Sequence, residues 1–200
     1  MPLNKAQIRQ ILIEKRRALS ADASRAASEC AAKLFVQHAF FKESERIACY
    51  FGQKDEINCS FIIDEIWRTQ KSCYLPVLFQ NHLEFKRYEI NSSLKLNKYN
   101  ILEPDETETL LASELDVVLV PLVGFDLNGN RVGRGGGYYD RTFEFLQNSA
   151  VKKPYLIGFA YECQRVDELP SDPWDVPLNA VLTEEKIYFF NRAAPAMNST

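Results

Sequence analysis

The feature that most constrains the fold is the run at residues 116–120, which reads Asp-Val-Val-Leu-Val. Its apolar residues follow one another without polar alternation, which predicts a strand buried on both faces. Shorter apolar runs at 47–51, 73–79, 155–159 and 180–182 predict further core strands. Residues 186–190 predict either a late edge strand or a helical turn.

Helical segments separate these strands. Ile8, Ile11, Leu12 and Leu19 recur at helical spacing, and Ser20 is a candidate N-cap for an alanine-rich helix ending near residue 41. Further helices are predicted at 61–67, around 107–111 (short and acidic) and at 139–147, and residues 83–90 predict a hairpin partner for strand 73–79. Strands alternating with helices predict the α/β class, with a mostly parallel sheet covered on both faces.

Composition favours one globular domain. Of the 200 residues, 46% are hydrophobic and 26% charged, and no repeat or compositional break marks a second domain. We expect a single domain over 1–192 and a frayed tail at 193–200. A net charge of −3 provides no general attraction for nucleic acid or anionic membranes.

Compartment and metal content follow from a few residue types. No apolar run approaches the roughly 18–20 residues that span a bilayer, and charges interrupt the N-terminal segment, so a cytoplasmic location is expected. The five cysteines lack Cys-x-x-Cys spacing and the two histidines lie in no cluster. These features favour free thiols and argue against a zinc site.

The strongest functional signal lies at residues 121–141. Four of the eight glycines, Gly133, Gly135, Gly136 and Gly137, stand between a predicted strand and a predicted helix, after turn formers at 126–130. Glycine permits positive φ and close approach of a ligand, so the loop amides and the helix start can converge on a phosphate, beside the charges of Arg131 and Arg134. The pattern is neither the P-loop nor the dinucleotide fingerprint, and a structural turn is the alternative.

Three further groups have two interpretations each. Asp140 is either a helix-start carboxylate favoured by the helix dipole or a Mg²⁺ ligand facing phosphates. Lys5 and Arg9 share one helix face, with Arg16 close to the same stripe; such a stripe is usually solvated. Tyr99 either packs as an ordinary tyrosine or stacks on a ligand.

An ordered string of motifs resembles the 5-formyltetrahydrofolate cyclo-ligase family. It comprises Val120-Pro121, Gly124-Phe125-Asp126, Arg131-Val132-Gly133 and Arg134-Gly135-Gly136-Gly137-Tyr138-Tyr139-Asp140-Arg141, with further matches at Lys5 and Arg9, Tyr50-Phe51, Asp55-Glu56-Ile57, Glu103-Pro104 and Asp175. The resemblance implies a three-layer α/β/α sandwich of the type shared with sugar-phosphate isomerases and CoA transferases. It also implies ATP- and Mg²⁺-dependent cyclisation of 5-formyltetrahydrofolate to 5,10-methenyltetrahydrofolate, with release of ADP and phosphate.

The resemblance assigns roles residue by residue. ATP contacts fall to Lys5, Arg9, Arg131, Gly133, Arg134, Gly135, Gly136, Gly137, Tyr138 and Tyr139. Folate contacts fall to Phe51, Glu56, Arg134, Gly135, Gly136, Gly137 and Tyr138. Arg134 and Tyr138 are the expected catalytic residues, and Asp140 and Asp175 the expected metal ligands. Some relatives carry a lysine where Gly136 stands, and the resemblance gives Arg16 no role.

The expected partners are therefore ATP and 5-formyltetrahydrofolate, with no nucleic acid, no membrane and a monomeric protein. Two other classes are kept as alternatives. One is a non-catalytic relative that binds folate or nucleotide to regulate another process. The other is an RNA-binding module built on the arginine–glycine loop, which the acidic charge balance disfavours.

Overall fold

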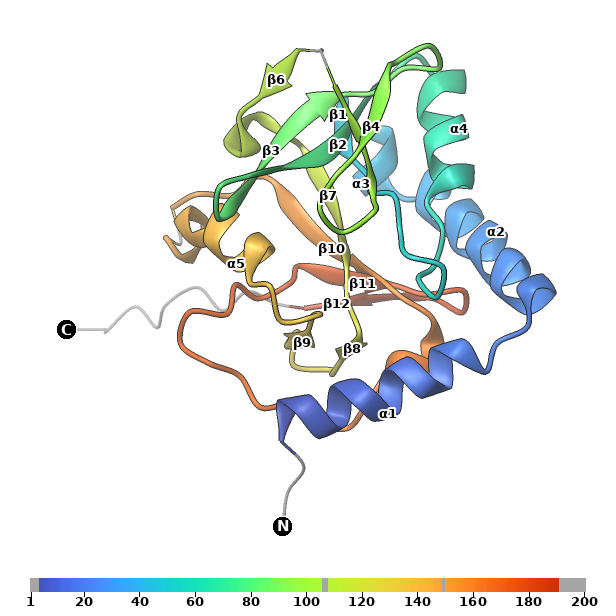
Figure 1. Ribbon diagram of the computed structural model, residues 1–200, viewed down its shortest axis with the longest axis vertical. Coiled ribbons are helices and arrows are strands. Elements are labelled where there is room, and N and C mark those ends of the chain that lie inside the picture. The colour runs from blue at the N-terminus through green and yellow to red at the C-terminus, as the bar shows by residue number, and fades with distance from the viewer. Residues whose placement is uncertain (1–3, 106–107, 149, 191–200) are drawn as a thin grey trace.

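An eight-stranded sheet forms the centre of the molecule in the order β12-β11-β10-β7-β1-β2-β3-β6 (Figure 1). The computed structural model describes residues 4–105, 108–148 and 150–190. The helices are α1 (Lys5–Arg17), α2 (Ala21–Gln37), α3 (Ala39–Lys42), α4 (Ser60–Arg68) and α5 (Tyr138–Thr142), with 3-10 helices η1 (Ala112–Glu114), η2 (Glu144–Gln147) and η3 (Glu162–Gln164). The strands are β1 (Arg46–Ala48), β2 (Ser72–Phe79), β3 (His82–Arg87), β4 (Leu94–Leu96), β5 (Leu102–Pro104), β6 (Thr109–Leu110), β7 (Val117–Pro121), β8 (Gly124–Phe125), β9 (Arg131–Val132), β10 (Tyr155–Phe159), β11 (Ala180–Leu182) and β12 (Ile187–Phe189).

Strand β7 lies in the middle of the sheet, as its apolar run predicts. It pairs in parallel with β1 on one side and β10 on the other. Val117 and Leu119 join one apolar cluster, and Val118 and Val120 join the cluster on the opposite face. Because successive side chains of a strand point to opposite faces, only a continuous apolar run can fill both.

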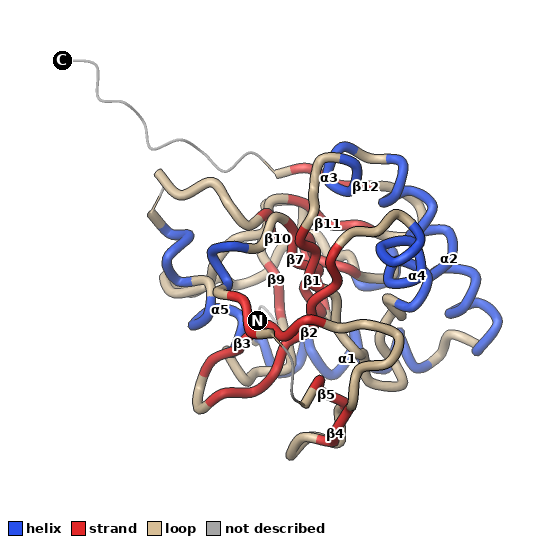
Figure 2. The backbone as a smooth tube through the Cα atoms, turned by 90° about the horizontal axis from the view of Figure 1, so that it is seen from above, coloured by secondary structure: helices blue, strands red, loops and turns tan. Residues whose placement is uncertain are grey.

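Helices cover the two faces of the sheet, which confirms the three-layer α/β arrangement. Helices α2 and α4 lie on one side and α5 on the other (Figures 1 and 2). Phe35 and Ile62 pack into the first cluster, and Phe143 and Leu146 into the second. The five strands from β11 to β2 are parallel, while β12, β3 and β6 are antiparallel at the edges.

Both N-terminal helices begin at a side-chain cap, and the cap at Ser20 is the predicted one. Asn4 accepts hydrogen bonds from the backbone N–H groups of Ala6 and Gln7, each at 3.0 Å, and starts α1. Ser20 Oγ accepts the N–H of Ala23 at 3.1 Å and starts α2. A side-chain oxygen at this position satisfies an amide that the helix itself cannot. Helix α1 then crosses below the sheet beside the short β8–β9 hairpin (Figure 1).

Three local predictions are wrong. The acidic segment near 107–111 is not a helix: residue 107 lies outside the described residues, and Thr109–Leu110 pairs with β3 because that sheet edge offers unpaired main-chain groups. The helix expected at 139–147 divides at Phe143 into α5 and η2. The helix expected to end near residue 41 divides at His38 into α2 and α3. Strands β4 and β5 form a separate hairpin for which the sequence makes no prediction.

Two further expectations have simple outcomes. The turn predicted at 126–130 is confirmed: buried Asp126 accepts the N–H groups of Asn128 and Asn130, and β8 and β9 flank it. This hairpin separates the glycine loop from β7. The tail at 193–200 lies outside the described residues, and across the three described ranges no helix has the length and apolar character to cross a membrane.

Candidate active site

A cavity of about 820 Å³ opens at the carboxyl ends of the parallel strands. This is the usual position of ligand sites in open α/β sheets. All the residues predicted for ATP, folate or metal line this one cavity: Lys5, Arg9, Phe51, Glu56, Arg131, Gly133, Arg134, Gly135, Gly136, Gly137, Tyr138, Tyr139, Asp140 and Asp175. Helix α1, the segment after β1, the glycine loop and the segment before β11 each contribute part of the wall.

The glycine loop has a backbone that side chains would strain. Gly135 has φ +98° and Gly137 has φ +65°, both in the region that favours glycine. Arg9 Nε donates to the carbonyl of Gly133 at 2.6 Å, which ties α1 to the loop. Among the described residues, the N–H groups of Gly135, Gly136 and Gly137 donate to no backbone or side-chain acceptor. The loop therefore offers a row of amide donors beside an arginine.

Lys5 marks one end of the cavity. Its Nζ lies 2.6 Å from Asp172 Oδ2 and 2.7 Å from Asp175 Oδ2. Burial acts to lower the pKa of Lys5, but its hydrogen bonds to the two carboxylates outweigh burial and raise the pKa above the ordinary value. Lys5 is thus a fixed positive charge at any physiological pH.

Asp140 and Asp175 are brought close together by one main-chain contact. Asp140 Oδ1 accepts the N–H of Val176, the residue after Asp175, at 3.1 Å. The same oxygen accepts Arg131 Nη2 at 2.5 Å, and Arg131 Nη1 also donates to the Val176 carbonyl. The Arg131 guanidinium is buried and committed to these contacts, so it orients Asp140 as well as adding charge.

The chemistry of the two carboxylates suits a divalent cation such as Mg²⁺. Asp175 uses Oδ2 for Lys5 Nζ and for the N–H of Asp172, as Asp140 uses Oδ1, so each has its second oxygen for a cation. Within the described ranges no three His, Cys, Asp or Glu side chains are grouped as a metal-binding set. Mg²⁺ commonly takes one or two carboxylates plus phosphate oxygens, without a protein cage.

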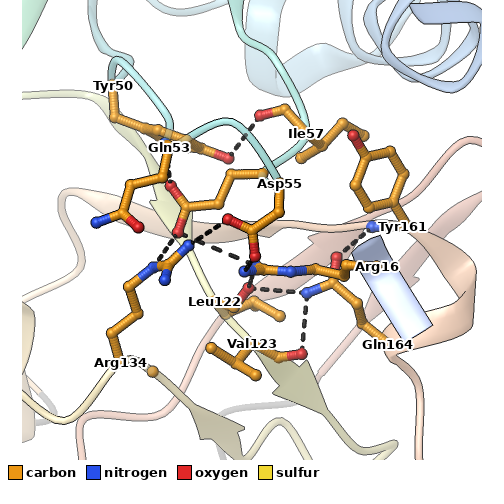
Figure 3. A network of polar contacts seen from close by, with 12 residues as sticks. Arg16, Tyr50, Gln53, Asp55, Ile57, Leu122, Val123, Arg134, Tyr161 and Gln164 are labelled. Carbon is orange, nitrogen blue, oxygen red and sulfur yellow. Dashed lines mark hydrogen bonds and ion pairs between the residues drawn. The ribbon is translucent and has the colours of Figure 1, made fainter. Parts of the chain in front are cut away.

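Arg134 marks the other end of the cavity and lies in a network of charges (Figure 3). Its Nε donates to Glu56 Oε1 and its Nη2 to Asp55 Oδ1, each at 2.8 Å. Burial acts to lower the pKa of Arg134, and the contacts with Glu56 and Asp55 outweigh it and raise the pKa. Behind them, Arg16 bonds Asp55 Oδ2 and donates to the Leu122 carbonyl at 3.1 Å.

Arg16 corrects the expectation of a solvated stripe on α1. Its side chain is only 1% exposed. Ile8 and Leu12, each one turn apart from the next, are buried on the same face of α1, because residues four apart lie above one another on a helix. That spacing is the signal in the sequence that could have placed Arg16 inside.

Two tyrosines line the cavity where the glycine loop enters α5. The Tyr138 hydroxyl lies 3.2 Å from that of Tyr99, at the tip of the β4–β5 hairpin. This hydrogen bond and, next, one with Lys98 lower the pKa of Tyr138. Tyr139 stacks on Phe143, with 6.2 Å between ring centroids, and burial raises its pKa.

The segment after β1 presents Phe51 and Glu56 to the cavity. Phe51 is half-buried and meets Tyr88 edge-on, with ring centroids 5.3 Å apart. Glu56 Oε2 accepts the N–H of Gln53 at 2.8 Å and closes a tight turn. Cys49, Cys59 and Cys73 are buried in the core behind this segment, as expected of core thiols.

The sequence does not predict several residues of the cavity. Asp172, Trp174 and Gln53 line it, as does Tyr99, for which the sequence leaves two interpretations open. Asp55 lies directly behind Arg134. Asp172 stands three residues before Asp175 in a proline-rich segment, and only the fold shows that both carboxylates reach Lys5.

Comparison with known proteins starts from the fold. The chain is similar to a solved 5,10-methenyltetrahydrofolate synthetase from Aquifex aeolicus, with a TM-score of 0.82 and 30% identity, over 95% of this chain and 94% of that one. The fold and cavity therefore define an α/β protein of the methenyltetrahydrofolate synthetase type.

Sequence comparison identifies the family. The chain is 37% identical to the 5-formyltetrahydrofolate cyclo-ligase of Escherichia coli over 180 residues, which cover 88% of this chain and 97% of that protein. It is 42% identical to the protein of the same name from Haemophilus influenzae over 146 residues, covering 70% and 76%. The model of the 5-formyltetrahydrofolate cyclo-ligase family matches residues 3–184. The chain belongs to this family.

Proposed function

We propose that this protein cyclises 5-formyltetrahydrofolate to 5,10-methenyltetrahydrofolate at the expense of ATP, releasing ADP and phosphate. The observation that carries the proposal is the convergence of the glycine-loop amides, Lys5, Arg134 and Glu56 on one cavity, in a chain of the cyclo-ligase family. Loop amides and cations suit a triphosphate, and a carboxylate suits the N–H donors of a pterin ring.

The reaction balances in two steps. The formyl oxygen attacks the γ-phosphorus of ATP, an O–P bond forms, and the bond to ADP breaks. N10 of the folate then attacks the activated formyl carbon and loses its proton. The C–O bond breaks, and phosphate leaves with the bonding electrons, so the new ring carries a delocalised cation between N5 and N10.

The protein's part in these steps is placement and charge neutralisation. The N–H groups of Gly135, Gly136 and Gly137 and the guanidinium of Arg134 would neutralise the phosphoryl group in transfer. Lys5 and Arg9 would hold the remaining phosphates. Glu56 would accept the pterin donors, while Phe51 and Tyr138 would border the folate.

Asp140 and Asp175 would hold Mg²⁺ against the ATP phosphates, where the ion supplies further charge neutralisation. We expect Asp140→Asn to raise the Mg²⁺ concentration that gives half-maximal turnover by about ten-fold, since one anionic ligand of two is lost. Asp64→Asn, at an exposed position of helix α4, is the matched control. An unchanged Mg²⁺ titration in Asp140→Asn would remove Asp140 from the metal site.

We also propose a monomer that works in the cytoplasm on these small molecules alone. The buried free thiols suit a reducing compartment, and the net charge of −3 gives no general affinity for nucleic acid.

The test is turnover by the purified protein. With 5-formyltetrahydrofolate and Mg·ATP we expect new near-ultraviolet absorbance of the methenyl product, and one ADP and one phosphate per product. A folded protein that binds either substrate but forms no product, beside an active cyclo-ligase as control, would make it a non-catalytic relative.

A further inference from the structure

Asp55 lies behind the cavity wall and links two arginines. Its Oδ1 accepts Arg134 Nη2 at 2.8 Å, and its Oδ2 is bonded to Arg16. It borders a second cavity of about 800 Å³ on the far side of Arg134. Asp55 therefore acts on the first cavity only through the arginine in front of it.

Glu56, the other partner of Arg134, already uses both of its oxygens. Oε1 accepts Arg134 Nε at 2.8 Å, and Oε2 accepts the N–H of Gln53 at 2.8 Å. A pterin that donates two hydrogen bonds to this carboxylate must compete with Arg134 for it. When the folate engages Glu56, Asp55 is the carboxylate left to hold the guanidinium.

Arg16 gives Asp55 the rigidity for this task. The Arg16 guanidinium is 1% exposed, and its Nη1 donates to the Leu122 carbonyl at the end of β7. Gln164 Nε2 donates to the same carbonyl at 2.8 Å, which ties the network to η3 (Figure 3). Turning Asp55 away would leave buried Arg16 with only Glu56 Oε1, 4.0 Å from its Nη1, as an anion, which is costly.

We propose that Asp55, anchored by Arg16, is a positioning residue that keeps Arg134 aimed at the phosphoryl group while Glu56 engages the folate. The proposal rests on the proposed function for the identity of the two ligands. The two adjacent carboxylates then have different roles: Glu56 contacts the substrate, and Asp55 holds the guanidinium of Arg134.

The first test measures the position of Arg134 without using turnover. Phenylglyoxal modifies accessible arginines, and peptide mass spectrometry gives the labelling rate at each site. In Asp55→Asn we expect Arg134 to be labelled several-fold faster than in the wild type, while Arg68 is unchanged. Asp116→Asn is the control, since Asp116 is also ion-paired, to Lys153, at the opposite end of β7. Equal rates at Arg134 in Asp55→Asn and wild type would overturn the proposal.

The second test is the division between kcat and KM. We expect Asp55→Asn to lower kcat by about 100-fold, as misplacement of a reacting-site group by about 1 Å can do, with the KM for folate nearly unchanged. Glu56→Gln should instead raise that KM. Asp55→Glu keeps the anion beside Arg16 and so retains the fold, but it moves the contact with Arg134. Its kcat should therefore fall between those of the wild type and Asp55→Asn.

A kcat of wild-type size in folded Asp55→Asn or in Asp55→Glu would overturn the positioning role. Absence of turnover in the wild type would overturn the proposed function instead, and the labelling rates would still decide on Asp55.

Discussion

A cation lies between two carboxylates at each end of the cavity, but the carboxylates at the two ends differ in burial. At one end Lys5 contacts Asp172 and Asp175, whose side chains are 42% and 23% exposed. At the other end Arg134 contacts Asp55 and Glu56, which are 12% and 9% exposed. The two cations are similarly exposed, at 26% for Lys5 and 33% for Arg134, so the difference lies in the carboxylates. Exposed carboxylates exchange readily with water and salt, whereas buried ones fix geometry, and Asp55 is itself held by buried Arg16. We infer that Lys5 can leave its carboxylates for a ligand more readily than Arg134 can.

The largest expected effect is on stability, at Arg16. Arg16→Ala leaves Asp55 nearly buried without its anchor, and removing one partner of a buried ion pair costs about 3–5 kcal/mol. Urea denaturation measures the loss. Arg17→Ala, on the exposed neighbour, should change the unfolding free energy by less than about 0.5 kcal/mol. Equal, small losses in both variants would contradict a buried anchor.

The next effect is on catalysis, at Arg134. Removing one preorganised positive group from a transition state costs about 10²–10³-fold in kcat. We therefore expect Arg134→Ala to lose turnover of this size and to keep its thermal midpoint close to the wild type. Arg68→Ala removes another ion-paired arginine, from an exposed position of helix α4, and should change neither kcat nor the thermal midpoint. If Arg134→Ala unfolds, the arginine is structural.

A smaller effect is expected at Lys5. Lys5→Met should raise the KM for ATP by about ten-fold, equivalent to about 1.4 kcal/mol. Because Lys5 is partly exposed, added salt should raise the KM for ATP in the wild type more steeply than in Lys5→Met. Lys33→Met, at a solvent-exposed pair on α2, is the control. If the KM for ATP depends on salt identically in wild type and Lys5→Met, the proposed difference between the two ends of the cavity is wrong.

The smallest effect is the pH dependence of stability. Burial acts to raise the pKa of Asp55, but hydrogen bonds from Arg16 and Arg134 outweigh it, so the pKa lies below its usual value of 3.8. A carboxyl with a lowered pKa stabilises the fold above that unfolded value and loses this contribution as pH falls through the folded value. The stability difference between wild type and Asp55→Asn should therefore shrink below pH 3.8.

Lys5 gives the opposite sign. Its pKa is raised, so its stabilising contribution is complete below the unfolded value of 10.5 and is lost as pH rises through the higher folded value. Lys5→Met should thus approach wild-type stability only in strong alkali. Thermal unfolding of the wild type, Asp55→Asn and Lys5→Met from pH 2.5 to 11 measures both pH dependences. A stability difference between wild type and Asp55→Asn that grows in acid would contradict the ion pairing of Asp55.

How much the sequence could predict depends on the range of the interactions. The β7 run, the cap at Ser20 and the turn at 126–130 depend on local patterning. The structure has a strand, a helix start and a turn at these positions, as expected. The edge strand β6 and the β4–β5 hairpin form because main-chain groups of distant segments pair. Neither segment has a strong pattern of its own.

The site divides in the same way. The residues that line the cavity could be predicted from the motif string, because a motif keeps its ligand-facing positions. Their partners could not: Asp55 meets Arg134 across 79 positions and Asp172 meets Lys5 across 167. The sequence predicts a solvated Arg16 because charged residues are usually exposed, although its spacing with Ile8 and Leu12 places it on the buried face of α1.

The most direct measurement is a crystal structure with ADP, Mg²⁺ and 5-formyltetrahydrofolate bound. We expect the phosphates on the N–H groups of Gly135, Gly136 and Gly137, the metal between Asp140 and Asp175, and the pterin on Glu56 with Arg134 still against Asp55. Phosphates bound elsewhere, with the glycine loop closed against its own domain, would contradict the assignment of this loop as the nucleotide site.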